Sequence, residues 1–286
     1  MENILELEGL SKSYDDFTLK NVDFNLPKGS IMGLVGENGA GKTTIIKLIL
    51  NLIKKESGYI KVFDLDNIEN EQQIKEKIGV VLDESYFHDN LRPKDITLIM
   101  DNIYSNWNKS QFLDYLKKFK LPADKIVKDF SKGMKMKLSI AVALSHDPQF
   151  LILDEPTSGL DPIVRSEILD IFLDFIQDEE KSILFSTHIT SDLDKIADYI
   201  TFIHDGKIIF SESKDEMINN FGIIKCGKDD FNKIDKADIV GYRKSQFGYE
   251  VLIKDKQRNR SKYNKYVIDS ASLEDIMLLY IRRDSE

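Results

Sequence analysis

The segment GENGAGKTT, residues 36–44, lies directly after the apolar run IMGLV (31–35) and directly before a helical pattern that extends from Thr44 to Ile53. It matches the spacing G-x-x-x-x-G-K-[ST], in which glycines let successive backbone amides face one anion and the following helix adds the positive end of its dipole. Such a loop binds the phosphates of a nucleotide. A chance glycine turn is the alternative, and the flanking strand and helix weigh against it.

The side chains of this loop predict particular contacts. Lys42 would reach the β- and γ-phosphates of the nucleotide, and the Thr43 hydroxyl would ligate Mg²⁺. The predicted phosphate-binding residues are Gly36, Glu37, Asn38, Gly39, Ala40, Gly41, Lys42, Thr43 and Thr44.

A second segment, FLILDEP at 150–156, places two acids after four apolar residues. A buried strand would deliver Asp154 to its carboxyl end, where it can hold Mg²⁺ through the water shell of the ion. Glu155 is then the candidate that polarises the water attacking the γ-phosphate. An Asp-Glu pair alone is more often a solvated strand end, but the preceding phosphate loop favours the catalytic interpretation.

The order of strand-like and helix-like runs predicts an α/β protein with a mainly parallel central sheet. Residues 4–10 and 19–26 alternate apolar and polar side chains, as in half-buried strands, whereas 150–153, 182–186 and 199–203 are short buried runs. Between residues 93 and 145 the pattern changes to helices without strands, at 93–104, 109–119 and 131–145. This stretch is predicted to be a helical insertion.

Bulk properties limit the possible functions. The net charge of −9 over 286 residues weighs against nucleic acid as the main partner. The single Cys226 cannot form an internal disulfide, which favours a reducing compartment. No signal-peptide pattern opens the chain, and its oiliest run, 45–53, is much shorter than the roughly 20 apolar residues of a spanning helix. The chain is therefore not expected to cross a membrane by itself.

Three further motifs give the sequence a family resemblance. FSKGM (130–134) stands where the signature LSGGQ stands in ATP-binding cassette (ABC) proteins, SGLD (158–161) resembles their D-loop, and STH (186–188) carries their switch histidine. The sequence thus resembles the nucleotide-binding subunit of an ABC transporter, and the three motifs together oppose a phosphate-loop kinase or GTPase outside that family.

The resemblance implies a fold and a domain organisation. The fold is a P-loop NTPase cassette with an antiparallel β subdomain, a mainly parallel core sheet and a helical insertion. The cassette would span 1–213, with its helical subdomain at about 84–145, and a small α+β region would follow at 214–286. ATP and Mg²⁺ are the implied cofactors, and two copies would face each other head to tail with two ATP molecules between them.

The resemblance also assigns roles to single residues. Tyr14 would stack on the adenine, and Ser131 and Gly133 would contact the γ-phosphate bound by the opposite subunit. Asp161 would link the two sites across the interface, and His188 would contact the γ-phosphate beside the catalytic glutamate. A lone tyrosine or histidine is more often structural, so these two assignments rest on position within the motif order.

The sequence departs from the family pattern at two places. Asp83, with Glu84 next to it, occupies the position of a glutamine that contacts Mg²⁺ and the attacking water; an ionised aspartate can ligate the metal but donates no hydrogen bond. A surface-loop acid is the alternative for Asp83. In the signature, Lys132 replaces a glycine and Met134 replaces a glutamine, while the serine and second glycine that contact phosphate remain.

The departures in the signature, followed by Lys135 and Lys137, resemble a branch of small bacterial exporters of drugs, peptides or other amphipathic molecules. Members of this branch typically end in a phrase like SLEDI, which lies here within SASLEDIMLLYIRR (270–283). Ser272 can cap a helix there, with Leu273, Ile276, Met277 and Tyr280 on one face. The resemblance implies a separate membrane permease subunit, so that the chain would lie peripherally at the cytoplasmic face of the cell membrane.

Two alternatives concern the C-terminal region and the function. The basic segment KDKQRNRSKYNK (254–265) could contact anionic lipid headgroups, but a solvated hairpin connection between EVLIK (250–254) and KYVID (265–269) is favoured over that interpretation.

A soluble ABC-type ATPase or regulatory ATP-binding module, acting on ribosomes or DNA, is the functional alternative. Neither a second cassette nor a long coiled-coil insertion supports it in this sequence.

Overall fold

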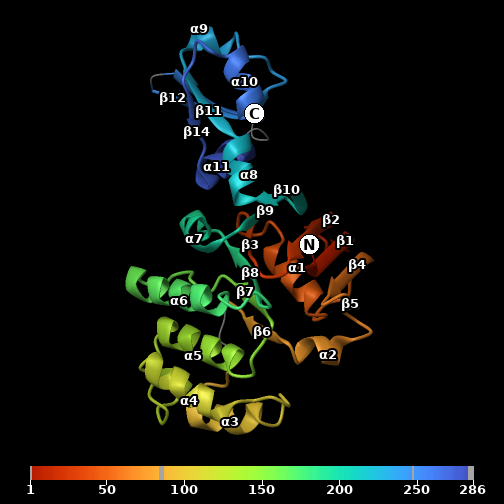
Figure 1. The fold of residues 1–286 in the computed structure, drawn as a ribbon, viewed down its shortest axis with the longest axis vertical. Coiled ribbons are helices and arrows are strands. Elements are labelled where there is room, and N and C mark those ends of the chain that lie inside the picture. The colour runs from red at the N-terminus through yellow and green to blue at the C-terminus, as the bar shows by residue number, and fades with distance from the viewer. Residues whose placement is uncertain (1, 84–86, 247, 283–286) are drawn as a thin grey trace.

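The structure is a computed structural model that describes residues 2–83, 87–246 and 248–282 (Figure 1). The described residues form three sheets. The core sheet and its helices occupy the middle of the elongated molecule, helices α3 (Pro93–Met100) and α4 (Lys109–Lys118) lie at one end, and the C-terminal sheet lies at the other (Figure 1).

The core sheet has the strand order β10-β9-β3-β8-β7-β6. Its strands are β3 (Ile31–Val35), β6 (Ile78–Val81), β7 (Phe150–Asp154), β8 (Ser182–Thr187), β9 (Tyr199–His204) and β10 (Lys207–Ser213). All neighbouring pairs are parallel except β10 with β9. The predicted mainly parallel sheet and the four predicted strands in it are confirmed, whereas β6 and β10 were not predicted.

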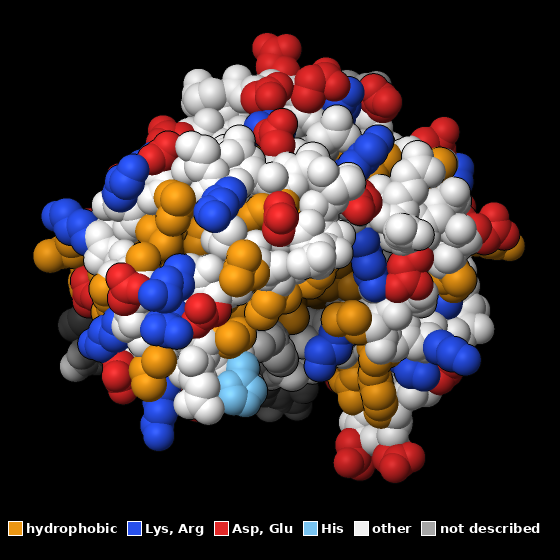
Figure 2. Space-filling model, turned by 90° about the horizontal axis from the view of Figure 1, so that it is seen from below, with side chains coloured by type: hydrophobic (Ala, Val, Ile, Leu, Met, Phe, Trp, Pro, Cys, Tyr) orange, Lys and Arg blue, Asp and Glu red, His pale blue; other side chains and the backbone are white. Residues whose placement is uncertain are grey.

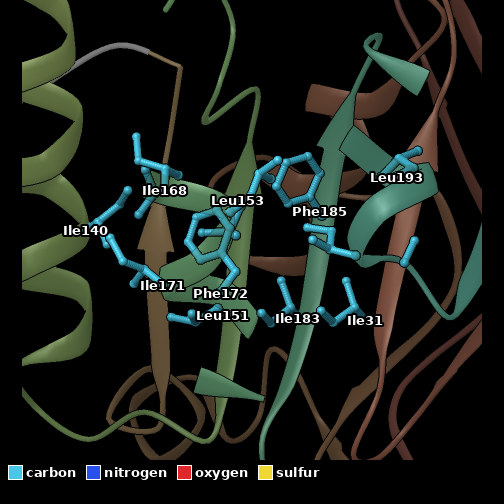
Figure 3. Close-up of a cluster of buried hydrophobic side chains, with 14 of the residues drawn as sticks. Ile31, Ile140, Leu151, Leu153, Ile168, Ile171, Phe172, Ile183, Phe185 and Leu193 are labelled. Atoms are coloured by element: carbon cyan, nitrogen blue, oxygen red, sulfur yellow. The ribbon is translucent and has the colours of Figure 1, made fainter. Parts of the chain in front are cut away.

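The two faces of the core sheet explain its continuous apolar runs. In β7, Leu151 and Leu153 join a cluster beneath helices α5 (Lys132–Leu144) and α6 (Pro162–Phe175), while Phe150 and Ile152 join the cluster on the opposite face. Phe172 of α6 packs edge to face on Phe185 of β8, with ring centroids 5.8 Å apart (Figure 3). Because both faces are covered, apolar residues follow one another without alternation in such a strand, as in Phe150–Leu153 of β7.

The second face is covered by an antiparallel sheet of order β2-β1-β4-β5 and by helix α1 (Lys42–Ile49). The strands are β1 (Asn3–Ser13), β2 (Thr18–Pro27), β4 (Ser57–Val62) and β5 (Leu65–Asp66). The two predicted half-buried strands are confirmed as β1 and β2. Helix α1 begins two residues earlier than predicted and ends before Ile53, since Asn51 takes a left-handed conformation with φ 53°.

The helical insertion is confirmed among the described residues from 87 to 145, which contain helices and no strand. Besides α3, α4 and α5 they include the 3₁₀ turn Val127–Asp129, and α2 (Glu71–Lys75) precedes the insertion. Asn108 and Ser131 cap α4 and α5 by accepting hydrogen bonds from the backbone amides of Gln111 and Met134. Helix α7 (Thr190–Ile196) follows β8.

The C-terminal region forms a four-stranded sheet of order β12-β13-β11-β14. Its elements are α8 (Lys214–Asn220), β11 (Gly222–Cys226), α9 (Lys228–Phe231), β12 (Ile239–Ser245), β13 (Gly248–Ile253), α10 (Lys256–Lys262), β14 (Ile268–Ser270) and α11 (Leu273–Arg282). The predicted hairpin between EVLIK and KYVID is wrong. Strand β11 lies between β13 and β14, and the segment between them forms α10, anchored by Asn259, whose side-chain amide donates to the Lys254 carbonyl at 2.7 Å.

Helix α11 is confirmed as predicted. The Ser272 hydroxyl accepts from the Asp275 amide at 3.1 Å, and Leu273, Ile276 and Met277 are buried. The buried cluster that includes these three residues also includes core-sheet side chains, so the apolar core is continuous across the boundary expected at 213–214. That boundary stays a prediction. Among the described helices, none is long and apolar enough to cross a membrane.

Candidate functional site

The loop between β3 and α1 wraps around the ammonium group of Lys42. Lys42 Nζ donates to the carbonyl oxygens of Gly36 at 2.8 Å and Glu37 at 3.2 Å, and the residue is only 5% exposed. Gly39 and Gly41 have φ angles of 86° and 117°, in the left-handed region that favours glycine. The local sequence therefore produces the curled loop and places its lysine under it, as the motif predicted.

Asp154 lies at the carboxyl end of β7, beside the first turn of α1. Its carboxylate accepts hydrogen bonds from the Thr43 hydroxyl at 2.8 Å and from the Ser186 hydroxyl at 2.9 Å. Burial raises the pKa of the Asp154 carboxyl, and the two hydroxyl donors oppose that shift. A buried carboxylate next to a hydroxyl offers the hard oxygen ligands that Mg²⁺ prefers.

Glu155 follows in a left-handed backbone conformation with φ 51°, which is uncommon for a residue with a side chain. Its Oε2 lies 2.8 Å from His188 Nδ1, and its Oε1 lies 3.4 Å from Lys42 Nζ. The Thr187 hydroxyl donates to Oε2 at 3.5 Å. The structure thus brings together three predicted residues, Lys42, Glu155 and His188, from three separate segments, and backbone strain of this kind is concentrated at functional sites.

Tyr14 is 47% exposed, and Lys12 Nζ lies 5.5 Å from the centroid of its ring. Its amide donates to the Phe17 carbonyl at 2.7 Å, and Phe17 Cζ lies 2.9 Å from the position that a Cβ on Gly41 would occupy. Phe17 is therefore an aromatic ring that contacts the phosphate loop, and it was not predicted from the sequence. Its position three residues after Tyr14, in the turn before β2, is the signal that could have identified it.

Ser131, Gly133 and Asp161 lie apart from the phosphate loop of the same chain. The exposed Ser131 and Asp161 cap α5 and α6, Asp161 by accepting from the amides of Ile163 and Val164 at 3.1 Å each. A Cβ on Gly133 would lie 3.3 Å from a methyl of Val164, so the two helix starts lie side by side. Among the described residues, no hydrogen bond connects this surface to residues 36–44.

Asp83 is exposed in the loop after β6 and lines a cavity of about 390 Å³ with Phe130, Lys132 and Lys135. In the part of the chain that the structure describes, Asp83 forms no hydrogen bond or ion pair with Thr43 or Asp154. Its role as a metal ligand stays a prediction, and Glu84 lies outside the described residues.

The two hydroxyl residues of the STH motif also lie at the site, although only its histidine was predicted to do so. Ser186 contacts Asp154, and Thr187 contacts Glu155. Both are buried at the carboxyl end of β8, next to the end of β7. The sequence could have indicated these two contacts, because neighbouring parallel strands bring their carboxyl ends to the same edge of the sheet.

A glycine loop around a lysine, a hydroxyl against a buried aspartate and a glutamate beside a histidine define a phosphate-loop nucleotide hydrolase. A family model described as ABC transporter matches residues 19–158. The chain is 40% identical over 226 residues to the lantibiotic transport ATP-binding protein SrtF of Streptococcus pyogenes, covering 76% of this chain and 96% of the relative. It is 36% identical to the bacitracin transport ATP-binding protein BcrA of Enterococcus faecalis, covering 73% and 69%.

Solved structures agree with these relatives. An ATP-binding subunit of an ABC transporter is 25% identical, with a TM-score of 0.68 over 75% of this chain and 91% of that chain. A dimeric ATP-binding cassette in a post-hydrolysis state, bound to ADP and Pi, shares the fold with a TM-score of 0.66 at 22% identity, covering 73% and 98%. The chain belongs to the ABC transporter family, in which it is an ATP-binding and ATP-hydrolysing subunit. The predicted family, fold class and ATPase activity are confirmed.

Proposed function

We propose that this chain drives the export of an amphipathic peptide or drug through a separate membrane permease, with two copies hydrolysing Mg²⁺-bound ATP between them. The similarity to proteins named for lantibiotic and bacitracin transport supports the substrate class. The observation that carries the proposal is the contact of Glu155 with both His188 and Lys42, next to the Thr43–Asp154 pair. In this geometry Glu155 would be the base, because it lies beside Lys42, which would hold the terminal phosphate.

Each side chain has a separate task in the proposed reaction. Lys42 would stabilise charge on the β- and γ-phosphates, and Thr43 with Asp154 would hold the metal ion, which supplies further charge neutralisation when bound. Glu155 would accept hydrogen bonding from the attacking water and orient it toward the γ-phosphate. His188, whose Nδ1 contacts Glu155, would hold the carboxylate in place. Catalysis in this scheme is positioning combined with electrostatic stabilisation.

A second copy of the chain would complete the site. Ser131 and Asp161 are exposed at adjacent helix N-termini and do not contact the phosphate loop of their own chain. The N-terminus of α5 presents backbone amides and the positive end of the helix dipole, which suits a phosphate. Head-to-tail pairing would bring this surface onto the ATP held by the partner's loop.

The permease would dock at the end of the molecule that carries the helical insertion. A groove of about 620 Å³ lies between β6, α2 and the segment after α3. Apolar side chains that include Leu52, Val80 and Ile103 line much of it, and α2 adds the polar side chains of Glu71, Gln72 and Lys75. Leu52 and Ile103 are 54% and 56% exposed, and the space-filling view from this end shows hydrophobic side chains around a hollow (Figure 2). Exposed apolar surface of this kind supports a protein interface.

The proposed docking of the permease at this groove also indicates whether the basic segment 254–265 can reach the lipid. Figure 1 shows the C-terminal sheet and α10 at the end opposite α3 and α4. If the permease docks at the groove, the chain lies at the inner surface of the membrane with α10 directed away from the lipid. The arrangement therefore supports a solvated surface for this segment rather than a lipid contact.

Replacing Glu155 with Gln tests the proposed reaction. The variant should bind ATP, hydrolyse it about 10² to 10⁴ times more slowly, and accumulate as an ATP-bound dimer in size-exclusion chromatography, because the general base is lost while the phosphate loop remains. Glu179→Gln is the control, since Glu179 is exposed near the opposite end of β8 from Thr187. Hydrolysis by Glu155→Gln at the rate of this control contradicts the assignment.

The permease interface needs a separate experiment. The tagged chain, isolated from detergent-solubilised membranes, should retain a multi-helix membrane protein, and Ile103→Glu should lose that protein while ATP hydrolysis persists. A carboxylate in place of the exposed Ile103 side chain would have to lose its water on docking, so docking would be disfavoured. Recovery of ribosomes without a membrane protein would support the soluble alternative instead.

A further inference from the structure

Asp192 is a completely buried carboxylate in the first turn of α7, and it lies outside the set of residues described above. It accepts a hydrogen bond from the Thr157 hydroxyl at 2.7 Å and pairs with Arg165, whose Nε lies 2.5 Å from Oδ1. The guanidinium of Arg165 also donates to the Ser191 hydroxyl at 2.7 Å. One buried acid therefore joins three separate segments of the chain.

Two of these segments carry the Glu155–His188 contact. Thr157 lies two residues after Glu155, in the loop that follows β7, and it is 1% exposed. Asp192 lies four residues after His188, and its amide donates to the Ile189 carbonyl at 3.2 Å. The Thr157–Asp192 hydrogen bond is thus a further connection between the two segments whose side chains meet at the site.

The third segment leads to the surface where the second copy is proposed to dock. Arg165 lies one helical turn after Asp161, and its amide donates to the Asp161 carbonyl at 3.0 Å. Asp161 itself is exposed and caps α6. Because this hydrogen bond ties Arg165 to Asp161, a displacement of Asp161 would move Arg165, which is bound to Asp192.

Such a carboxylate is expensive to bury. Removing it from water costs more than a well-packed apolar residue would, and the cost is tolerated where a defined geometry is needed. Arg165 and Thr157 supply a charged partner and a hydroxyl donor to it. These partners satisfy the buried carboxylate, but they do not explain why an acid occupies the position.

We propose that Asp192 is a positioning residue that aligns the Glu155–His188 pair with the Asp161 surface, so that docking of the second copy reaches the catalytic carboxylate through Arg165 and Asp192. The inference rests on the proposed roles of Glu155 and of head-to-tail pairing. Asp192 touches neither nucleotide nor water in this scheme. It acts by holding three segments in one arrangement.

Thr157→Val is the variant that tests the proposal with least risk to folding, since it keeps the side-chain shape and removes only the hydroxyl. The expected result is a kcat at least tenfold lower with ATP affinity within twofold of the unaltered protein, and Thr157→Ser should restore kcat. Asp192→Asn should show the same split between kcat and affinity. Glu167→Gln is the matched control: it removes the ion pair with Lys137 from another face of α6, and its kcat should not change.

Dimerisation separates a positioning role from a structural one. The double variant Glu155→Gln/Thr157→Val should still form the ATP-bound dimer, which places the defect of Thr157→Val after assembly. Loss of that dimer, an unchanged kcat in Thr157→Val, or equal losses of kcat and ATP affinity would each overturn the inference. The proposed function fails by a different result, namely full hydrolysis by Glu155→Gln alone, so the two failures are distinguishable.

Discussion

Replacing Gly36 with Ala should displace the phosphate loop, and the structure gives the size of the effect. A Cβ at this position would lie 2.3 Å from the carbonyl oxygen of Ile203 in β9, whereas ordinary contact begins at 3.4 Å. The loop or the neighbouring strand must therefore move by about 1 Å, since a packed interior has no free space to absorb the methyl group. Overpacking of this kind costs about 1 to 3 kcal/mol of folding free energy.

The effect on nucleotide binding follows from the same displacement. Spoiling one hydrogen bond between a backbone amide and a phosphate costs about 1.5 to 3 kcal/mol, which weakens ATP binding by about 10- to 150-fold. Titration with a fluorescent ATP analogue measures the affinity, and calorimetry measures the melting temperature, which should fall by about 2 to 10 °C.

Gly227→Ala is the control for this substitution. Gly227 has a φ of −75°, and among the described residues, its two chain neighbours aside, no atom lies within 4 Å of the position of its added Cβ. This variant should keep both the ATP affinity and the melting temperature. An affinity within twofold of the unaltered protein in Gly36→Ala would refute the argument that the contact with β9 sets the position of the loop.

Three further substitutions probe the site. His188→Ala should lower kcat at least about tenfold with little change in ATP affinity, because the Glu155 carboxylate loses its 2.8 Å contact with His188. Steady-state phosphate release measures kcat, and an unchanged kcat would contradict the role of His188. Tyr14→Ala should raise the KM for ATP by about 5- to 150-fold through lost stacking, while Tyr14→Phe should not; equal values for the two variants would exclude stacking. Asp154→Asn should melt higher than the unaltered protein at pH 7 without nucleotide, yet lose Mg²⁺-dependent hydrolysis. Burial raises the pKa of Asp154 in the folded protein, so the folded protein binds this proton more tightly than the unfolded chain does. The carboxylate therefore lowers the free energy of unfolding as the pH rises through that pKa, and the uncharged Asn removes this cost. A lower melting temperature for Asp154→Asn would contradict the expected increase in stability.

Much of the fold could be predicted because its signals are local. The strands β3, β7, β8 and β9 were predicted from apolar runs, and the helices of the insertion from the helical pattern of residues 93–145. Strand β6 was missed although it is largely buried, since IGVV offers only four residues of pattern. The predicted hairpin near the C-terminus failed because strand pairing is a long-range property: β11, far earlier in the chain, lies between β13 and β14.

The candidate site shows the same division. Lys42 and its loop were predictable, since consecutive residues dictate the backbone turn. The contacts of Phe17 with the loop and of Thr157 with Asp192 were not predictable. Each joins two residues that lie far apart in the sequence, and no local pattern indicates that they meet. Ser186 lay inside a motif already noted, and only the pairing of β8 with β7 gave its hydroxyl a partner.

The sequence by itself determined the chemistry of this protein: a phosphate loop, an aspartate and glutamate after an apolar strand, and three motifs in the order of one family. Only the tertiary structure decided which groups meet. It placed Glu155 between His188 and Lys42, kept Ser131 and Asp161 away from the loop of their own chain, and buried Asp192 among three segments. The physical reason is that backbone conformation follows from neighbouring residues, whereas contacts between distant segments follow from how strands and helices pack around a shared core.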